Sequence, residues 1–143
     1  MSQTTVNMSG LVGDVVTGLR TVLACPVEQY WRLEPPAVLT CFVQPNSEHS
    51  EKGRGIGATW VSGFAIDVWL EVPWDDKVAT GASLSNAVET VKEWIGNNRA
   101  LVVDGAVDYV TRYDSIEYLF VTRPGAGKPV FAAKVPLIIE WPK

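Results

Sequence analysis

A single histidine, His49, is the residue on which most catalytic or metal sites in this 143-residue chain would depend. With Glu48 and Glu51 it offers three donors close in sequence, a set that could hold a divalent metal ion. A Ser–His–Asp or Cys–His arrangement would need the same imidazole. A metal site also needs outer contacts that fix its geometry, and a catalytic base needs a rigid platform. Because the surrounding segment is polar and rich in glycine, we expect a solvated surface there, with no catalytic residue and no metal.

Two pairs of acidic residues have the types that acid–base catalysis requires. Asp67 and Glu71 would share one face of a strand, but four residues at strand rise place them about 13 Å apart. That separation exceeds the carboxylate spacing of a glycosidase. Asp75 and Asp76 form the second pair. A solvated sheet face or a subunit contact explains these carboxylates better than catalysis does.

Two glycine-containing stretches imitate nucleotide-binding loops without the required context. Residues 123–129 (RPGAGKP) have Thr122 where a phosphate-binding loop needs its first glycine, and Pro129 where it needs Ser or Thr. A strand is expected to follow, so no helix N-terminus would face a phosphate. Residues 53–57 (GRGIG) precede a strand instead of linking a strand to a helix. We therefore expect no cofactor and no enzymatic activity.

The composition fits one domain that builds a hydrophobic core. The chain is 47% hydrophobic and 20% charged, with a formal net charge of -4. A net negative charge argues against a surface that binds the phosphates of nucleic acid. No run of 18 apolar residues and no signal-like N-terminus is present, so we expect no membrane partner. Cys25 and Cys41 are expected to be buried, reduced thiols.

Residues 59–73 (TWVSGFAIDVWLEVP) predict a central strand with one buried and one wet face. The even, apolar positions are Phe64, Ile66, Val68, Leu70 and Val72; the odd positions include Asp67, Trp69 and Glu71. Gly63 interrupts the pattern and is expected to mark a bulge or bend. We expect the rest of the domain to pack on the even face.

Two helices are predicted to supply that packing. The first begins at Ser9 as N-cap, carries Val15, Leu19 and Leu23 on its apolar side, and ends at Cys25–Pro26. The second runs from Leu84 to Ile95, with Thr80 or Ser83 as its cap and the Gly96–Asn98 stretch as its stop. Residues 1–8 are expected to be flexible.

The remaining segments predict strands and one long loop. Residues 37–43 read as a strand covered on both faces, and residues 44–57 as a mobile loop that contains Glu48, His49, Glu51, Lys52 and Arg54. Residues 106–113, 116–122 and 130–141 predict further strands, with Pro136 marking an edge strand or a bulge. The predicted fold is α+β, with a mainly antiparallel four- to five-stranded sheet and two helices packed on one face.

Six tryptophans need an explanation, and the sheet face without helices offers two. The residues there pack as ordinary cover for that face, or they form a protein interface, where Trp and Tyr concentrate binding energy. We favour the interface. Its candidate residues are Trp60, Asp67, Trp69, Glu71 and Trp74, with Trp69 as the anchor.

The order of these segments resembles the tail terminator (tail completion) proteins of long-tailed bacteriophages. The similar features are an amphipathic first helix, a strand led by Pro-Pro (Pro35–Leu39), a polar loop and a long alternating strand that ends at Pro73. An Asp-containing connection, the helix Leu84–Ile95 and a closing hairpin with a last strand Phe131–Trp141 follow. The resemblance covers nearly the whole chain.

The resemblance implies a small α+β subunit of a hexameric ring, a structural virion protein at the tail–neck junction that is assembled in the host cytoplasm. Its partners would be further copies of itself, the tail tube protein that it caps and the head–tail connector protein. DNA would pass through the lumen without specific binding, and the 44–57 loop would order on assembly. Neighbouring neck and tail proteins share the fold, so the fold alone does not fix the role. The alternative, from another class, is a small-molecule binding domain or enzyme with an aromatic cleft.

Overall fold

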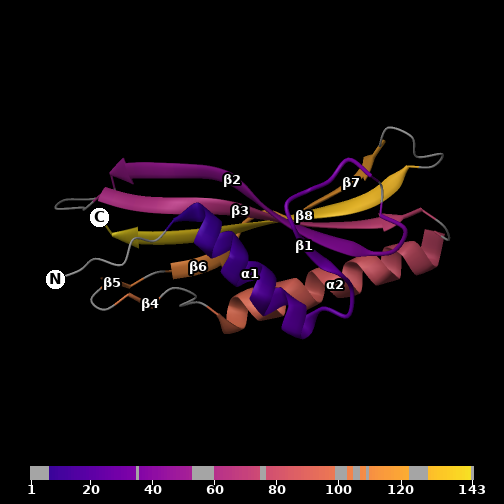
Figure 1. The fold of residues 1–143 in the computed structure, drawn as a ribbon, viewed down its shortest axis with the longest axis horizontal. Coiled ribbons are helices and arrows are strands. Elements are labelled where there is room, and N and C mark those ends of the chain that lie inside the picture. Colours follow the sequence, from indigo (N-terminus) through magenta and orange to yellow (C-terminus); the bar gives the residue numbers. More distant parts are fainter. Residues whose placement is uncertain are drawn as a thin grey trace.

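Two helices and eight strands follow one another in the computed structural model, which describes residues 7–34, 36–52, 60–74, 77–98, 103–104, 107–108, 110–122 and 129–142 (Figure 1). In chain order they are α1 Met8–Val22, β1 Val27–Gln29, β2 Thr40–Lys52, β3 Trp60–Pro73, α2 Lys77–Asn97, β4 Val103–Asp104, β5 Val107–Asp108, β6 Val110–Tyr113, β7 Glu117–Val121 and β8 Val130–Pro142.

Strand β3 lies at the centre of a six-stranded sheet, as the sequence predicts. The strand order is β1-β2-β3-β8-β6, and β7 pairs with β8 beside β6. β7 lies along Val130–Lys134 of β8, and β6 along Leu137–Glu140. All pairs are antiparallel except β1 with β2, which are parallel. The α+β class is confirmed; the sheet has one strand more than predicted, because no strand was expected at β1, which is only three residues long.

Both helices pack on the even face of β3, where the core forms (Figure 1). Phe64, Ile66, Val68, Leu70 and Val72 are all buried, together with the apolar sides of α1 and α2. The buried helix residues include Val15, Leu19, Val88, Val91 and Ile95, and Leu23 is partly buried against them. Alternation in the strand and helical spacing in the helices therefore located the core correctly.

The helix boundaries differ from the prediction at three of four ends. Asn7, not Ser9, caps α1: its Oδ1 accepts a hydrogen bond of 2.7 Å from the Gly10 amide. α1 ends at Val22, before Cys25–Pro26. α2 begins at Lys77, so the predicted caps Thr80 and Ser83 lie inside it. The predicted C-terminal stop is confirmed, since α2 ends at Asn97 and Asn98 Nδ2 donates to the Trp94 carbonyl at 2.7 Å.

The predicted mobile loop at 44–57 is wrong for residues 44–52, which continue β2. These residues pair with β3 as far as Lys52 opposite Trp60. A strand at the end of a sheet can be polar on both faces, because its ladder uses backbone groups and not side chains. Glu48, His49, Glu51 and Lys52 therefore belong to a strand. Arg54 and the rest of residues 53–57 lie outside the described residues, as do residues 1–6.

Proline positions explain the irregularities of the sheet. The register of β2 against β3 shifts between Pro45 and Ser47, so Asn46 is the extra residue of a bulge. The edge strand predicted from Pro136 is wrong, because β8 has neighbours on both sides. Pro136 lies in the short part of β8 between the residues that pair with β7 and those that pair with β6. Its carbonyl accepts a hydrogen bond of 3.0 Å from the Asp114 amide. A missing N–H disrupts no ladder there.

Candidate functional site

Glu71, predicted to lie on the wet face of β3, is completely buried. Its Oε1 accepts a hydrogen bond of 2.7 Å from Trp31 Nε1 and a second from Trp69 Nε1. A buried carboxylate is costly unless donors replace its water, and two indole N–H groups do so here. Glu71 exposes no surface in the single subunit, and its place among the interface candidates stays a prediction.

The connection between β1 and β2 is what covers this face of the sheet. It begins at Tyr30, whose φ of 70° turns the chain, and it places Trp31 against Glu71. Arg32 lies over the ring of Phe42, 5.9 Å from its centroid, and Phe42 is fully buried. The expectation of a wet odd face fails because this cover comes from residues about 40 positions away in sequence.

Asp67 is also bound inside the subunit. Nδ2 of Asn46, the bulge residue of β2, lies 3.0 Å from both carboxylate oxygens, and Lys134 Nζ lies 3.9 Å from Oδ2. Only 7% of Asp67 is exposed. Asp67 and Glu71 therefore have separate partners and form no acid–base pair. The carboxylate of Asp67 fixes the bulge and does not line a surface.

The third tryptophan of this group, Trp74, joins an aromatic cluster with Tyr118, Phe120 and Phe131. Its ring contacts Phe120 edge-on at a centroid distance of 5.3 Å and Phe131 at 6.0 Å. Phe131 in turn packs 4.9 Å from Phe120 and 6.3 Å from Tyr118. Tyr118 and Phe120 are 50% and 60% exposed. This exposed aromatic cluster on β7 was missed as a unit, because its members come from three segments of the chain.

Trp60 and the charged residues near the hairpin end occupy the ladder of β2 and β3. Trp60 is opposite Lys52, and Glu51 is opposite Val61. His49 is opposite Gly63, and its imidazole points across to β8, where Nε2 lies 3.5 Å from Glu140 Oε2. Glu140 is thus an acidic neighbour of His49. Among the described residues, no group of three or more His, Cys, Asp or Glu side chains could hold a metal.

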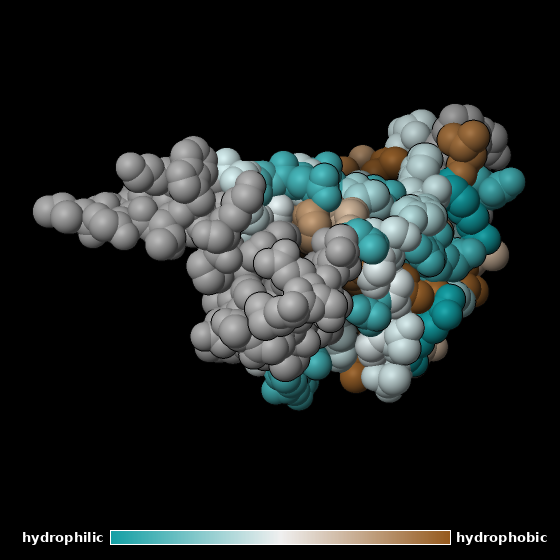
Figure 2. All heavy atoms as spheres, turned by 60° about the vertical axis from the view of Figure 1, so that its left-hand side comes forward, coloured by the Kyte–Doolittle hydropathy of each residue, from teal (hydrophilic) through white to brown (hydrophobic). Residues whose placement is uncertain are grey.

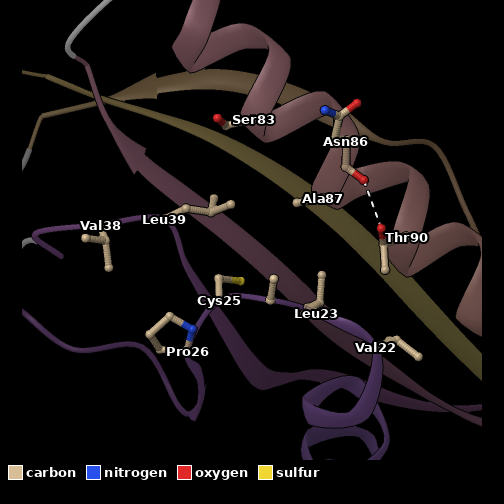
Figure 3. Close-up of a pocket in the computed structure, with 11 residues that line it drawn as sticks. Val22, Leu23, Cys25, Pro26, Val38, Leu39, Ser83, Asn86, Ala87 and Thr90 are labelled. Atoms are coloured by element: carbon tan, nitrogen blue, oxygen red, sulfur yellow. Dashed lines mark hydrogen bonds between the residues drawn. The ribbon is translucent and has the colours of Figure 1, made fainter.

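A groove runs between the end of α1 and the middle of α2 (Figure 3). Its volume is about 470 Å³. One side consists of α2 residues and the other of the segments that follow α1 and precede β2. The lining residues are Val22, Leu23, Ala24, Cys25, Pro26, Val38, Leu39, Ser83, Asn86, Ala87 and Thr90, none of them charged. Sequence patterns did not reveal this groove, although Val22 and Val38 are apolar and 45% and 57% exposed.

Both cysteines are free thiols, and Cys25 lines this groove. Cys41 is buried, and its amide donates to the Pro26 carbonyl at 2.9 Å, next to Cys25 in sequence. Burial raises the pKa of both thiols, more strongly for Cys41. A raised thiol pKa keeps the group protonated and unreactive near neutral pH. Neither cysteine therefore resembles an activated nucleophile.

A second hollow lies on the face of the sheet opposite the helices. It has a volume of about 490 Å³ and is lined by Trp31, Gln44, Trp69, Leu119, Phe120, Val121 and Thr122. Its aromatic walls come from the β1–β2 connection, β3 and β7. None of the described residues that line it is ionisable.

Comparisons with known proteins add little to this geometry. No family model matches the chain, and no curated protein matches it. A solved structure whose title names no function aligns with a TM-score of 0.40 at 17% identity, over 95% of this chain and 96% of that chain. A likeness this distant carries no argument about function. No helix in the described part of the chain is long and apolar enough to cross a membrane.

Proposed function

We propose that this protein is a structural subunit that assembles with copies of itself into a ring, as the tail terminator of a long-tailed phage. The observation that carries the proposal is the exposed aromatic cluster on β7. Tyr118 and Phe120 present rigid rings to solvent, backed by Phe131 and Trp74. Ordered aromatic side chains on an exposed edge strand are typical of protein interfaces, where they carry much of the binding energy.

The buried polar residues form hydrogen bonds within the subunit, which supports a role in assembly over a role in catalysis. The buried carboxylates of Asp67 and Glu71 are hydrogen-bonded to Asn46, Trp31 and Trp69, which anchors the bulge and the β1–β2 connection. These contacts stabilise the subunit and occupy both carboxylates. Figure 2 adds that the visible described surface is mostly polar, with apolar residues in small separate patches.

The ring would surround DNA without binding it specifically. A domain of this length has a radius of gyration of about 14 Å, and six such bodies in contact leave a central hole of roughly 37 Å. The net charge of -4 would repel phosphates that pass through such a lumen. Since Asp67 and Glu71 are buried, any acidic lining must come from other side chains. The tail tube protein and the head–tail connector protein would bind the two rims.

Assembly state tests the proposal most directly. Six copies of the 15.6-kDa chain give a particle of about 94 kDa, which light scattering after size exclusion distinguishes from a monomer. The measurement is made with the protein alone and after incubation with tail tubes assembled from the tube protein of a long-tailed phage. A ring of six in electron micrographs, free or on the tube end, is the expected result. A monomer under both conditions overturns the proposal.

A second candidate function, the binding of a small molecule, is favoured by the aromatic hollow between Trp31, Trp69 and Phe120. Planar apolar ligands would stack on such walls. Titration of small aromatic compounds, followed by tryptophan fluorescence and melting temperature, distinguishes the two functions. A monomeric protein with a saturable, ligand-dependent rise in melting temperature would favour the binding domain over the ring.

A further inference from the structure

The groove beside α2 is a continuous surface, and its described lining residues include no charged side chain. A neighbouring hollow shares Val38, Leu39 and Ser83 with it and extends along the N-terminal part of α2 past Ala79. None of the described residues that line either hollow is charged, although 20% of the chain is. A partner that brings a charge into this surface would lose hydration without gaining an ion pair. The groove therefore fits an apolar, uncharged segment.

The length of this surface matches a short strand. From Ala79 to Thr90 the groove follows α2 for eleven residues, about 16 Å at helical rise. A five-residue strand spans about 13 to 16 Å. Figure 3 shows Ser83, Asn86 and Ala87 along the α2 side, with Val38, Leu39 and Cys25 across from them. An extended segment would lie between these two sides.

Strand β7 has the properties that such an occupant needs. It is five residues long, and after Glu117 its four residues Tyr118–Val121 carry no charge. Among described strands it pairs only with β8, so its outer edge is open. Tyr118 and Phe120 alternate along it and are already held in place by Phe131. Rings that are ordered before binding lose little entropy on docking.

Hydrogen-bonding groups also correspond. The Tyr118 hydroxyl needs a partner when it is buried, and the groove offers the Asn86 amide and the Ser83 hydroxyl on α2. No residue of β7 lines the groove of its own chain. A second copy can therefore bring β7 to a groove that the first copy's β7 does not occupy.

We infer that β7 of one copy docks into the groove beside α2 of the next copy, with Tyr118 and Phe120 as the inserted side chains. This inference rests on the proposed ring and names the contact that closes it. Two different surfaces of each chain meet in a head-to-tail contact, which gives a ring when its rotation closes. The contact then lies between β7 and the helix layer, and not on the odd face of β3.

Cross-linking between two variants, each with one introduced cysteine, tests this contact; the native Cys41 stays buried in both. Phe120→Cys and Asn86→Cys are each made in a Cys25→Ser background, because Cys25 lines the groove. Both sites are exposed, so both variants should fold, which circular dichroism checks. After treatment with diamide, the mixture should give a covalent dimer with one copy of each variant, whereas each variant alone should give none. Glu89→Cys, exposed on α2 but outside the groove, is the matched control and should not link to Phe120→Cys.

Association measurements give an independent reading. Phe120→Ala should weaken self-association about tenfold or more, as truncation of a buried interface aromatic does. Leu33→Ala removes an equally exposed apolar side chain outside both surfaces and should change the affinity less than twofold.

The outcomes separate this inference from the ring itself. Rings that form without the Phe120–Asn86 cross-link, or with Phe120→Cys linked to itself, overturn the docking contact and leave the ring standing. A specific Phe120–Asn86 dimer in a protein that never closes into rings supports the contact and overturns the ring. A monomer that gives no cross-link at any concentration overturns both.

Discussion

His49 on β2 and Glu140 on β8 meet across the strand that separates them. Nε2 of His49 lies 3.5 Å from Oε2 of Glu140, and the residue between them on β3 is Gly63. A Cβ on Gly63 would lie 2.5 Å from His49 Cε1 and 3.1 Å from Glu140 Cγ. The glycine therefore permits this contact. The predicted bulge at Gly63 is wrong, since the register of β3 is regular there and the bulge belongs to β2.

The effect of Gly63→Ala on the unfolding free energy should depend on whether His49 is present. In the native protein the new methyl displaces a partly exposed imidazole from its contact with Glu140, and a surface contact of this kind is worth up to about 1 kcal/mol. The alanine itself favours a strand over glycine by about 0.5–1 kcal/mol. The net change in unfolding free energy should therefore be small, whereas in a His49→Ala background the same substitution should stabilise. Urea denaturation of the four proteins of this cycle should give a coupling free energy of about 0.5–1.5 kcal/mol. Additive effects would contradict the close approach.

Gly18→Ala tests the contact between the helices. A Cβ at Gly18 would lie 2.2 Å from Cζ2 of Trp94 on α2, and the Trp94 side chain is buried. Overpacking of this kind costs about 1–3 kcal/mol and outweighs the gain in helix propensity of up to about 1 kcal/mol. The midpoint of urea denaturation should therefore fall.

Gly13 on the same helix supplies the matched control. Nothing lies within 4 Å of a Cβ built there. Gly13→Ala should therefore stabilise the protein by up to about 1 kcal/mol. A Gly18→Ala protein as stable as Gly13→Ala would show that Trp94 does not pack against α1.

The core was predictable because it depends on local periodicity. Alternation from Phe64 to Val72 identifies the buried side of β3 without reference to any other segment. Helical spacing does the same for Val88, Val91 and Ile95. Such patterns show which residues face the core. They identify the buried residues when the elements that cover that face can also be predicted from the sequence.

Neither the burial of the odd face of β3 nor the extension of β2 could be predicted from the sequence, and the reasons are opposite. Glu71 and Asp67 are carboxylates, which are usually exposed, and only hydrogen bonds from the distant residues Trp31 and Asn46 make their burial possible. Residues 47–52 look like a loop because no side chain there has an apolar face to bury, although the backbone pairs with β3. In each case the deciding partner lies many residues away.

The groove and the aromatic cluster were missed because each is assembled from separate segments. Val22 and Val38 border the groove from either side of β1, and Asn86 faces them from α2. The one local signal was the exposed alternation of Tyr118 and Phe120, which was interpreted as an ordinary strand. Apolar residues left over after a core has been assigned are the sign that could have indicated a surface.

The cysteines should make stability fall at alkaline pH. Unperturbed thiols titrate near pH 9.0, and burial raises the pKa of Cys25 and Cys41 in the folded protein. The folded state therefore binds protons more tightly than the unfolded state above pH 9. The stabilising contribution is present in full below that pH and is lost as the pH rises toward the folded-state pKa. Urea titrations from pH 7.5 to 10.5 measure the decline.

Cys41→Ala isolates this effect from other groups that titrate in the same range. Cys41 is the more strongly shifted thiol, so the variant should start less stable but lose less stability between pH 9 and 10.5. The same slope in both proteins would assign the decline to lysines and tyrosines.

Replacement of Glu71 should destabilise the subunit by an amount that depends on whether the new side chain can accept hydrogen bonds from Trp31 and Trp69. Glu71→Leu keeps an apolar side chain of similar size but removes the acceptor of Trp31 Nε1 and Trp69 Nε1, and unpaired buried donors cost about 1–3 kcal/mol each. Glu71→Gln retains an oxygen that can accept and should cost only about 1–2 kcal/mol. Glu48→Gln, at an exposed position of β2, should stay within about 0.5 kcal/mol of the native protein. Chemical denaturation gives the three values. A Glu71→Leu protein as stable as Glu48→Gln would mean that the carboxylate does not anchor the β1–β2 connection.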